Sequence, residues 1–295
     1  MLIRRNREAR QELRLHRGDS LRFLKTIPEE SVQLTLTSPP YCMGKEYEGT
    51  DKIEDFIEAH EVLLPEICRI TSPGGNVCWQ VGYHVKNGEV TPLDYIVHSI
   101  MSKIPRMVLR NRIIWTYGHG LHCSNRFSGR HEMILWYSKD KSSIFDLDAI
   151  RVPQKYPGKR HYKGPQKGKY SGNPLGKNPG DVWDIPNVKA NHVEKTAHPC
   201  QFPVALALRL VKALSKRGDT VLDPFMGSGT TGVATIIAKR RFIGAEIFAK
   251  YYAIADRRCR SALDGTIRYR NPELSIYVPD PNSPLTTRQR AIKGA

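Results

Sequence analysis

The stretch DTVLDPFMGSGTTGVATIIAK, residues 219–239, joins a short apolar run, a glycine-containing turn and a helix-like segment. Thr220–Leu222 is typical of a buried strand, and Thr230–Lys239 has the composition of a helix. Between them, Gly227 and Gly229 lack the Cβ that would block the approach of a ligand to the backbone. This order of strand, turn and helix predicts a binding turn at the edge of a parallel α/β sheet.

Further apolar runs extend this pattern along the chain. Strand-like runs occupy Val32–Leu36, Asn76–Val81, Arg112–Trp115, Met133–Tyr137 and Arg241–Ala245. Helix-length segments with near-helical apolar spacing occupy Asp55–Ile70 and Val204–Leu214. Short buried strands that alternate with helices predict an α/β fold with a doubly wound, mostly parallel sheet.

The strand after the glycine turn ends at Glu246, about 20 residues beyond the turn, where an acidic side chain can accept hydrogen bonds from ribose hydroxyls. The turn is neither a three-glycine dinucleotide fingerprint nor a phosphate-binding loop, because no Gly-Lys-Ser/Thr follows it. The carboxylate of Asp223 would favour the cationic sulfonium and ammonium of S-adenosylmethionine over a pyrophosphate. We therefore expect S-adenosylmethionine as the cofactor, with a purely structural turn as the alternative.

The segment Thr37-Ser38-Pro39-Pro40-Tyr41 follows the first of the strand-like runs. Two consecutive prolines fix φ and restrict the residue before each, so the direction of the Pro39 carbonyl is set before a substrate binds. Ser38 Oγ and this carbonyl can accept hydrogen bonds from an exocyclic amine and localise its lone pair. Tyr41 can stack on a flipped-out base. The segment predicts direct methyl transfer to a nucleobase amine, and a simple proline turn is the alternative.

Composition points to a polyanionic partner. The 295 residues include 46 Lys+Arg and 29 Asp+Glu, a formal net charge of +17, which favours nucleic acid. The six cysteines form no CxxC pair and indicate a reducing compartment, so we expect a cytoplasmic protein. His119, His122 and Cys123 are interpreted as loop residues, and no metal site is expected. No run approaches the roughly 18 apolar residues that a membrane helix needs.

One stretch, from about residue 151 to 180, is rich in glycine, proline, lysine and tyrosine and lacks apolar periodicity. Cationic side chains interleaved with aromatic ones suit contact with phosphates and groove packing, so we interpret it as a DNA-facing insertion. The predicted DNA-binding residues are Lys155, Lys159, Arg160, Tyr162, Lys163, Lys167 and Lys169. A merely flexible loop is the alternative.

Four motifs together resemble the amino-methylating DNA methyltransferases, in the arrangement where the catalytic motif precedes the cofactor motif. Ser38–Tyr41 matches the family's Asp/Asn/Ser-Pro-Pro-aromatic motif, and Phe225–Gly229 matches its Phe-x-Gly-x-Gly loop. His198–Pro203 is similar to its His-Pro-x-x-x-Pro segment, and Gly18–Leu21 resembles its Gly-Asp element. The resemblance covers roughly residues 13–260.

The resemblance implies a Rossmann-like fold that binds S-adenosylmethionine. It implies four catalytic residues, Ser38, Pro39, Pro40 and Tyr41. The cofactor residues that we predict are Asp19, Thr37, Phe202, Asp223, Phe225, Gly227, Ser228, Gly229, Thr230 and Glu246. The expected regions are a catalytic half (1–139), a target-recognition insertion (140–190), a cofactor-binding half (191–262) and a basic, partly disordered tail (263–295). Residues 181–186 are expected to lead back into the scaffold.

Serine in the first catalytic position resembles the cytosine-N4 members, whereas adenine-N6 members more often carry Asp or Asn. We therefore predict a sequence-specific cytosine-N4 DNA methyltransferase of a restriction-modification system, accompanied by a cognate endonuclease and working as a monomer or homodimer. An adenine-N6 enzyme, an RNA or protein amine methyltransferase and an inactive DNA-binding subunit remain alternatives. Pro199-Cys200-Gln201 matches the nucleophile motif of cytosine-C5 enzymes. However, it precedes the cofactor loop, which is the opposite of the order in those enzymes.

Overall fold

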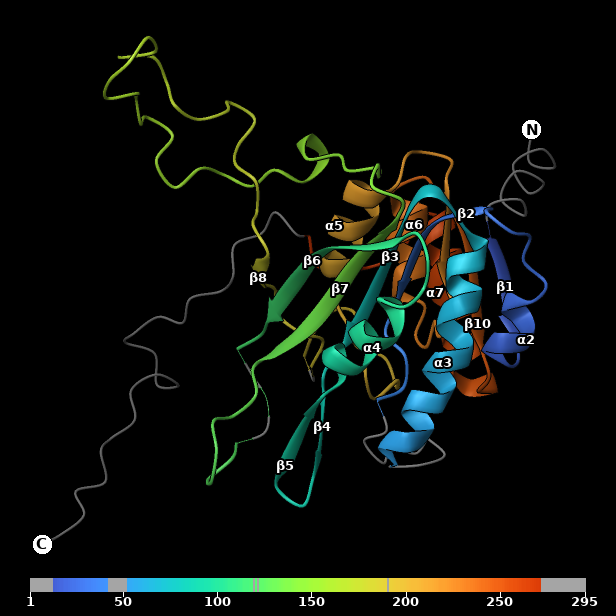
Figure 1. Ribbon diagram of the computed structural model, residues 1–295. Helices are drawn as coiled ribbons and strands as arrows, with labels where there is room; N and C mark the ends of the chain where they lie inside the picture. The colour runs from blue at the N-terminus through green and yellow to red at the C-terminus, as the bar shows by residue number, and fades with distance from the viewer. Residues whose placement is uncertain (1–12, 42–51, 119, 121, 190, 272–295) are drawn as a thin grey trace, which may run out of the picture.

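The computed structural model describes residues 13–41, 52–118, 120, 122–189 and 191–271 (Figure 1). Parts of the predicted catalytic half, His119 and most of the predicted tail lie outside these residues. An eight-stranded sheet has the order β1-β10-β9-β2-β3-β7-β6-β8. Its strands are β1 (Leu13–Arg17), β2 (Val32–Thr37), β3 (Thr71–Val81), β6 (Met107–Thr116), β7 (His131–Lys139), β8 (Val182–Asp184), β9 (Thr220–Asp223) and β10 (Arg241–Glu246). A separate hairpin pairs β4 (Tyr83–Lys86) with β5 (Glu89–Pro92).

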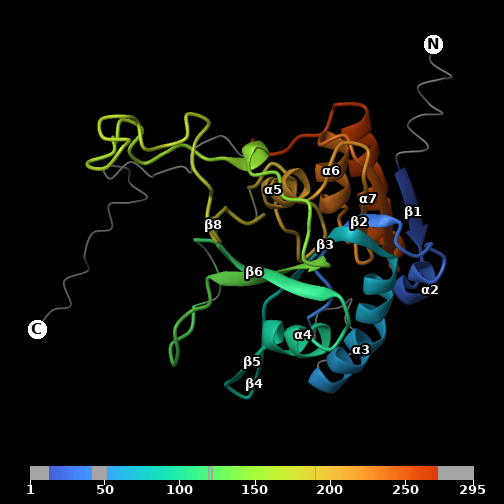
Figure 2. The same ribbon diagram turned by 45° about the horizontal axis from the view of Figure 1, so that its top comes forward.

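Helices cover both faces of the sheet, as Figure 2 shows. One face packs against α2 (Ser20–Leu24), α3 (Ile53–Ile70) and α4 (Leu93–Met101). The other packs against α5 (Val204–Leu214), α6 (Thr230–Ile237) and α7 (Ala249–Leu263), with a short 3-10 helix, η1 (Asp148–Ile150), beside α5. Because side chains alternate along a strand, Cys78 joins the α5 side while Val77 and Trp79 join the α3 side.

The prediction of a doubly wound, mostly parallel sheet is confirmed. Among the described strands of the large sheet, β1, β10, β9, β2 and β3 are parallel to one another, and β8 is parallel to β6. Within the described part of this sheet only β7 is antiparallel to its neighbours, on both of its edges. Each predicted strand is present and longer than expected. β1, β8 and the β4–β5 hairpin were not predicted, because edge strands and short hairpins carry too few buried apolar residues to reveal themselves.

The strand order reverses between β9 and β2, which are direct neighbours. From β9 the chain crosses through α6 to β10, and from β2 it crosses through α3 to β3 on the other side. In sheets of this kind, ligands bind outside the carboxyl ends of the strands at such a reversal. The loops that follow β2 and β9 begin with the two sequence motifs, Ser38–Tyr41 and Pro224–Gly229. The topology therefore brings both motifs to one edge of the sheet.

Residues 151–180 form an extended arm that leaves the body of the protein (Figure 1). At its base the chain is fixed to the start of β3, because Ile144 N–H donates to Gly74 O at 3.3 Å and Asn76 Nδ2 donates to Ile144 O at 3.1 Å. Asp146 N–H donates to Ala213 O, near the end of α5. The arm therefore starts at the amino end of β3, whereas both motifs lie at the carboxyl ends of β2 and β9.

Not all of the predicted 140–190 insertion lies outside the scaffold. Val182–Asp184 is the edge strand β8, and Trp183 is buried with Trp115 and Ile185 in the core beside α5. The Trp115 indole also donates to Ile185 O at 2.7 Å. The chain thus re-enters the sheet at the segment where we expected a return into the scaffold.

Candidate active site

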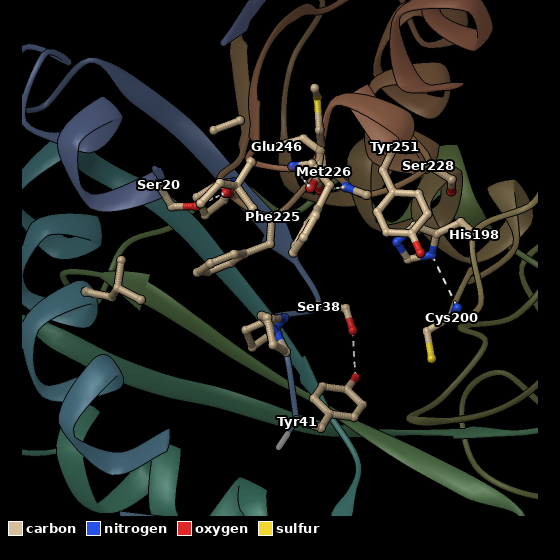
Figure 3. A pocket seen from close by; sticks show the side chains of 18 of the residues that line it. Ser20, Ser38, Tyr41, His198, Cys200, Phe225, Met226, Ser228, Glu246 and Tyr251 are labelled. Carbon is tan, nitrogen blue, oxygen red and sulfur yellow. Dashed lines mark hydrogen bonds between the residues drawn. The ribbon is translucent and has the colours of Figure 1, made fainter. Parts of the chain in front are cut away.

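A cavity of about 460 Å³ opens at the carboxyl edge of the sheet. Its walls come from the loops after β1, β2, β9 and β10 and from the segment before α5. Figure 3 shows Ser38 and Tyr41 on one side of it and the Phe225–Ser228 turn and Glu246 on another. The predicted site residues in its lining are Asp19, Ser38, Pro39, Pro40, Tyr41, Phe202, Phe225, Gly227, Ser228, Thr230 and Glu246.

Three predicted cofactor residues, Thr37, Asp223 and Gly229, do not line this cavity. Asp223 is 1% exposed, and it accepts hydrogen bonds from the Thr37 hydroxyl at 2.6 Å and the Phe225 N–H at 3.1 Å. Burial raises the pKa of its carboxyl to about 6, although hydrogen bonds from Thr37, Thr231 and Phe225 act in the opposite direction. Asp223 therefore links the ends of β2 and β9 beneath the cavity. Because it does not line the cavity, it could act on the cofactor only through its charge, and that role stays a prediction.

The glycines of the turn are required by protein packing. Gly227 and Gly229 have φ of 48° and 76°, a region that side-chain-bearing residues seldom adopt. A Cβ on Gly227 would lie 2.8 Å from His198 Nε2, and one on Gly229 would lie 2.9 Å from Ala255 Cα. The sequence suggested that these glycines make room for a ligand, but the space beside each is filled by another part of the protein.

A buried arginine supports the same turn from below. Arg258, on α7, donates from Nη1 to Ser228 O at 2.7 Å and to Ser228 Oγ and Thr230 Oγ1 at 3.1 Å. Burial lowers the pKa of this guanidinium. These three hydrogen bonds satisfy polar groups that the closely packed turn would otherwise leave unpaired, so Arg258 fixes the turn's shape.

Glu246 closes the other side of the turn. Its Oε2 accepts from Gly227 N–H at 3.1 Å and its Oε1 accepts from Phe248 N–H at 2.8 Å. Burial raises the pKa of the Glu246 carboxyl, and these backbone donors oppose that rise. The Ile247 N–H is a third backbone donor to this carboxylate, so three of its four acceptor positions are used and Glu246 can still accept one hydrogen bond from a ribose hydroxyl in the cavity.

His198 links the segment before α5 to the glycine turn. Its Nδ1 accepts from Cys200 N–H at 3.2 Å, and its ring lies edge-on to Tyr251 with 4.5 Å between centroids. Burial lowers the pKa of His198 to about 4, so the ring is neutral near pH 7. The shape of this segment therefore depends on a neutral imidazole packed on Gly227.

The catalytic loop is tied to the sheet through Tyr41. Ser38 Oγ and the Tyr41 hydroxyl lie 2.7 Å apart, and the hydroxyl also lies 3.2 Å from Gln80 O and 3.3 Å from Glu132 Oε2. Glu132 Oε2 in turn accepts from Gln80 Nε2 at 2.7 Å. Burial raises the pKa of Tyr41 well above its usual value, so the phenol keeps its proton.

Sequence reasoning did not select His198, Gln80, Glu132, Tyr251 or Arg258 as site residues. The His-Pro-x-x-x-Pro match was a signal for His198. Glu132 lies in an otherwise apolar strand, and Gln80 and Arg258 carry no local pattern, so nothing in the sequence marked them. They reach the site only because β3, β7 and α7 pack against its two loops.

The cavity fits S-adenosylmethionine. Its volume lies within the roughly 300–1,000 Å³ of small-molecule sites. Carboxylates at Asp19 and Glu246 suit ribose hydroxyls and a cationic ligand, and Phe202, Phe225 and Ile247 offer apolar surface to an adenine ring. Within the described part of the chain, no group of three or more His, Cys, Asp or Glu side chains could hold a metal ion.

All seven predicted DNA-binding residues lie on the arm and are exposed. Isolated antiparallel bridges join Val152 to Lys177 and Arg160 to Tyr170, and the Arg160 guanidinium lies 4.1 Å from the centre of the Tyr170 ring. Tyr162, near the tip, is 89% exposed. The arm therefore displays its cations to solvent, and none of these residues lines the cavity.

A reversal-point cavity that fits S-adenosylmethionine, with a Ser-Pro-Pro-Tyr loop in its wall, defines the class of S-adenosylmethionine-dependent methyltransferases. Residues 32–257 match the family model of N6/N4 DNA methylases, described as "DNA methylase". The chain belongs to this family. None of the helices described here is long and apolar enough to span a membrane.

Among similar proteins, the type II methyltransferase M.BglII of Bacillus subtilis is 41% identical over 284 residues, covering 94% of this chain and 79% of that protein. The DNA adenine methyltransferase YhdJ of Escherichia coli K12 is 34% identical over 279 residues, covering 92% and 90%. The protein is thus similar to site-specific methyltransferases of restriction-modification systems. This family membership agrees with the motif order that argued against Cys200 as a C5 nucleophile.

Solved structures support the same fold. PvuII DNA methyltransferase, described as cytosine-N4-specific, superposes with a TM-score of 0.67 at 20% identity, covering 85% of this chain and 92% of that one. A Thermus thermophilus protein, TTHA0409, in complex with S-adenosyl-L-methionine, superposes with a TM-score of 0.61 at 28% identity, covering 85% of this chain and 96% of that one. S-adenosylmethionine is the methyl donor of this protein, and DNA is its substrate.

Proposed function

We propose that this protein methylates the exocyclic N4 amine of a cytosine that is flipped out of duplex DNA. The supporting observation is Ser38, a serine at the first catalytic position, placed in the cavity wall beside Pro39 and Tyr41. The named specificities of similar proteins point both ways, since PvuII methyltransferase is cytosine-N4-specific and YhdJ is an adenine methyltransferase. The choice of base therefore rests on Ser38, and adenine N6 is the second candidate.

In this proposal Ser38 Oγ and the Pro39 carbonyl accept the two N–H groups of the amine, and Tyr41 stacks on the base. When bound, S-adenosylmethionine supplies a methyl group on a positively charged sulfur. A carbon–nitrogen bond forms as the carbon–sulfur bond breaks, and the extra amine proton passes to water. No covalent enzyme intermediate forms, so Cys200 has no nucleophilic role here.

The arm is proposed to hold the duplex through its exposed lysines and tyrosines. One branch begins at the opposite end of the sheet from the cavity, and the other re-enters the sheet at β8, level with the carboxyl end of β3. Each branch has roughly 12 residues and could reach about 40 Å if extended. That length is sufficient to follow a duplex toward the cavity. We further propose a cognate endonuclease, and a monomer or homodimer as the working form.

Identification of the methylated base tests this function. The purified protein is incubated with labelled S-adenosylmethionine and mixed-sequence duplex DNA, and the digested nucleosides are separated. We expect label in N4-methylcytosine. Label in N6-methyladenine would keep the amine mechanism and replace the base, whereas label in 5-methylcytosine or in no DNA would contradict the proposal.

A further inference from the structure

Ser38 can serve as a hydrogen-bond acceptor for the amine only if its own hydrogen points elsewhere. A hydroxyl carries one hydrogen and two acceptor lone pairs, so its direction depends on its partners. The nearest partner is the Tyr41 hydroxyl at 2.7 Å, and Figure 3 shows the two groups facing each other at the edge of the cavity. Either of these oxygens could be the donor if the pair were isolated.

The other partners of Tyr41 decide the direction. The main-chain carbonyl oxygen of Gln80, 3.2 Å from the Tyr41 hydroxyl oxygen, can only accept a hydrogen bond. Glu132 Oε2, at 3.3 Å, already accepts from Gln80 Nε2 at 2.7 Å. The single Tyr41 hydrogen is therefore directed toward Gln80 and Glu132, which leaves the Tyr41 oxygen to accept from Ser38.

We propose that Glu132 and the Gln80 carbonyl act through the Tyr41 hydroxyl to hold Ser38 as an acceptor for the substrate amine. Neither Gln80 nor Glu132 lines the cavity, so both are positioning residues. The proposal rests on the role of Ser38 stated above. It assigns Tyr41 two tasks, because the ring stacks on the base while the hydroxyl orients Ser38.

The surroundings of Glu132 suit this task. Burial raises the pKa of its carboxyl, and hydrogen bonds from Gln80, Tyr41 and Tyr117 act in the opposite direction because they stabilise the ionised form. Gly82 directly follows β3, and a Cβ placed there would lie 3.5 Å from Tyr41 Cε2 and 3.8 Å from Glu132 Cγ, within ordinary van der Waals contact. The Tyr41 ring and the Glu132 side chain therefore both lie beside Gly82.

A double-mutant cycle on Tyr41→Phe and Glu132→Ala tests the proposal. Both single changes should lower kcat at saturating DNA and S-adenosylmethionine, Tyr41→Phe by about tenfold and Glu132→Ala by about fivefold, since one misdirected hydrogen bond is at stake. The KM for DNA should change little, because the stacking ring remains. When Glu132→Ala is added to the Tyr41→Phe variant, kcat should fall by less than about a further twofold.

Glu132→Gln provides the matched control, because its side-chain oxygen still accepts a hydrogen bond. It should return kcat to within about threefold of the wild type, and all variants should keep the wild-type cofactor affinity. Tyr41→Phe and Glu132→Gln should stay close to the wild-type melting temperature, whereas Glu132→Ala should lower it by several degrees, because buried donors such as Gln80 Nε2 lose their acceptor. Equal losses from Glu132→Ala in the wild type and in the Tyr41→Phe variant would show a merely structural role and overturn the proposal. So would a Tyr41→Phe enzyme with full activity.

These outcomes are separable from failure of the proposed function. The cycle is measured on whichever amine the wild type methylates, so transfer to adenine does not affect the proposed orientation of Ser38 through Tyr41. Full activity of Ser38→Ala would contradict the role of Ser38 as an acceptor, on which this proposal depends. A wild type that methylates no DNA amine would refute the function directly, before any variant is compared.

Discussion

The glycine turn at residues 223–229 and the arm at residues 151–180 are both rich in glycine, yet opposite conditions shape them. In the turn, a Cβ at either glycine would meet His198 or Ala255, and Arg258 binds its carbonyl and hydroxyl groups from below. In the outer part of the arm, Gly164 and Gly168 also have positive φ, but no atom of another segment lies within 4 Å of a Cβ placed there. Toward the base of the arm, Gly172 and Gly176 are crowded by Gln154 and Val152, so the contrast applies to the outer part.

The contrast indicates that the glycine turn is preorganised by the rest of the fold, whereas the arm can adapt its contacts to a partner. The turn takes its shape from the rest of the fold, which suits a site where a methyl group must be aligned with an amine. The arm is held mainly by its own local hydrogen bonds and exposes its cations, which suits contact with a phosphate backbone. Changes at the cavity should therefore affect catalysis and stability, whereas changes on the arm should affect DNA affinity.

The largest effect is expected at the cavity. Ser38→Ala removes one acceptor of the substrate amine and should lower kcat by roughly 100- to 1,000-fold, as loss of one oriented hydrogen bond does at other active sites. Single-turnover methyl transfer measures this change, and the S-adenosylmethionine Kd should stay within about twofold of the wild-type value. Weakened cofactor binding with an intact transfer rate would place Ser38 in the cofactor site instead.

A matched pair of glycine substitutions addresses the comparison directly. Gly229→Ala must fit a Cβ 2.9 Å from Ala255 Cα at a φ of 76°, so we expect about 30-fold weaker S-adenosylmethionine binding and a destabilisation of about 2–4 kcal/mol. Gly164→Ala has a similar φ of 80° and free space. It should cost about 1–2 kcal/mol at most and should leave S-adenosylmethionine binding unchanged. Calorimetric titration and thermal unfolding measure both, and equal effects would abolish the distinction between turn and arm.

The buried carboxyl of Asp223 predicts a pH-dependent difference. Its folded-state pKa of about 6 exceeds the ordinary 3.8, so the stabilisation from its bound proton is full below about pH 4 and is lost as pH rises through 6. Relative to Asp223→Asn, the wild type should lose about 2–3 kcal/mol of unfolding free energy between about pH 4 and 7. Denaturant unfolding of both proteins across this range measures the gap, and a constant difference would contradict the raised pKa.

The smallest effect on the chemistry is expected from the arm. Replacing Lys159, Lys163, Lys167 and Lys169 by Gln should reduce the slope of log K against log salt by about 3–4, which weakens DNA binding by roughly a thousandfold at about 0.1 M salt. Melting temperature and cofactor affinity should not change. Fluorescence anisotropy at several salt concentrations measures the slope. An unchanged slope would mean that these lysines do not contact phosphates.

Much of the fold was predictable because strand and helix periods are local. Thr220–Leu222 and the apolar face of Val204–Leu214 show their burial in the sequence, and β9 and α5 follow. The β4–β5 hairpin, the edge strand β1 and the helix α4 were not predicted. The arm was recognised as a region without a core, but its attachment near Gly74, far from the catalytic edge, depends on the path of the whole sheet.

By itself, the sequence determined the class of sheet, the two loops at its reversal point and the cofactor, because each depends on residues that are neighbours along the chain. Only the tertiary structure decided that Asp223 lies under the cavity bound to Thr37, 186 positions away, and that Glu132 reaches Tyr41 across 91 positions. Such contacts arise when strands and helices pack. The direction of a buried hydrogen bond, and with it the proposed orientation of Ser38, is set by the side chains that packing brings together.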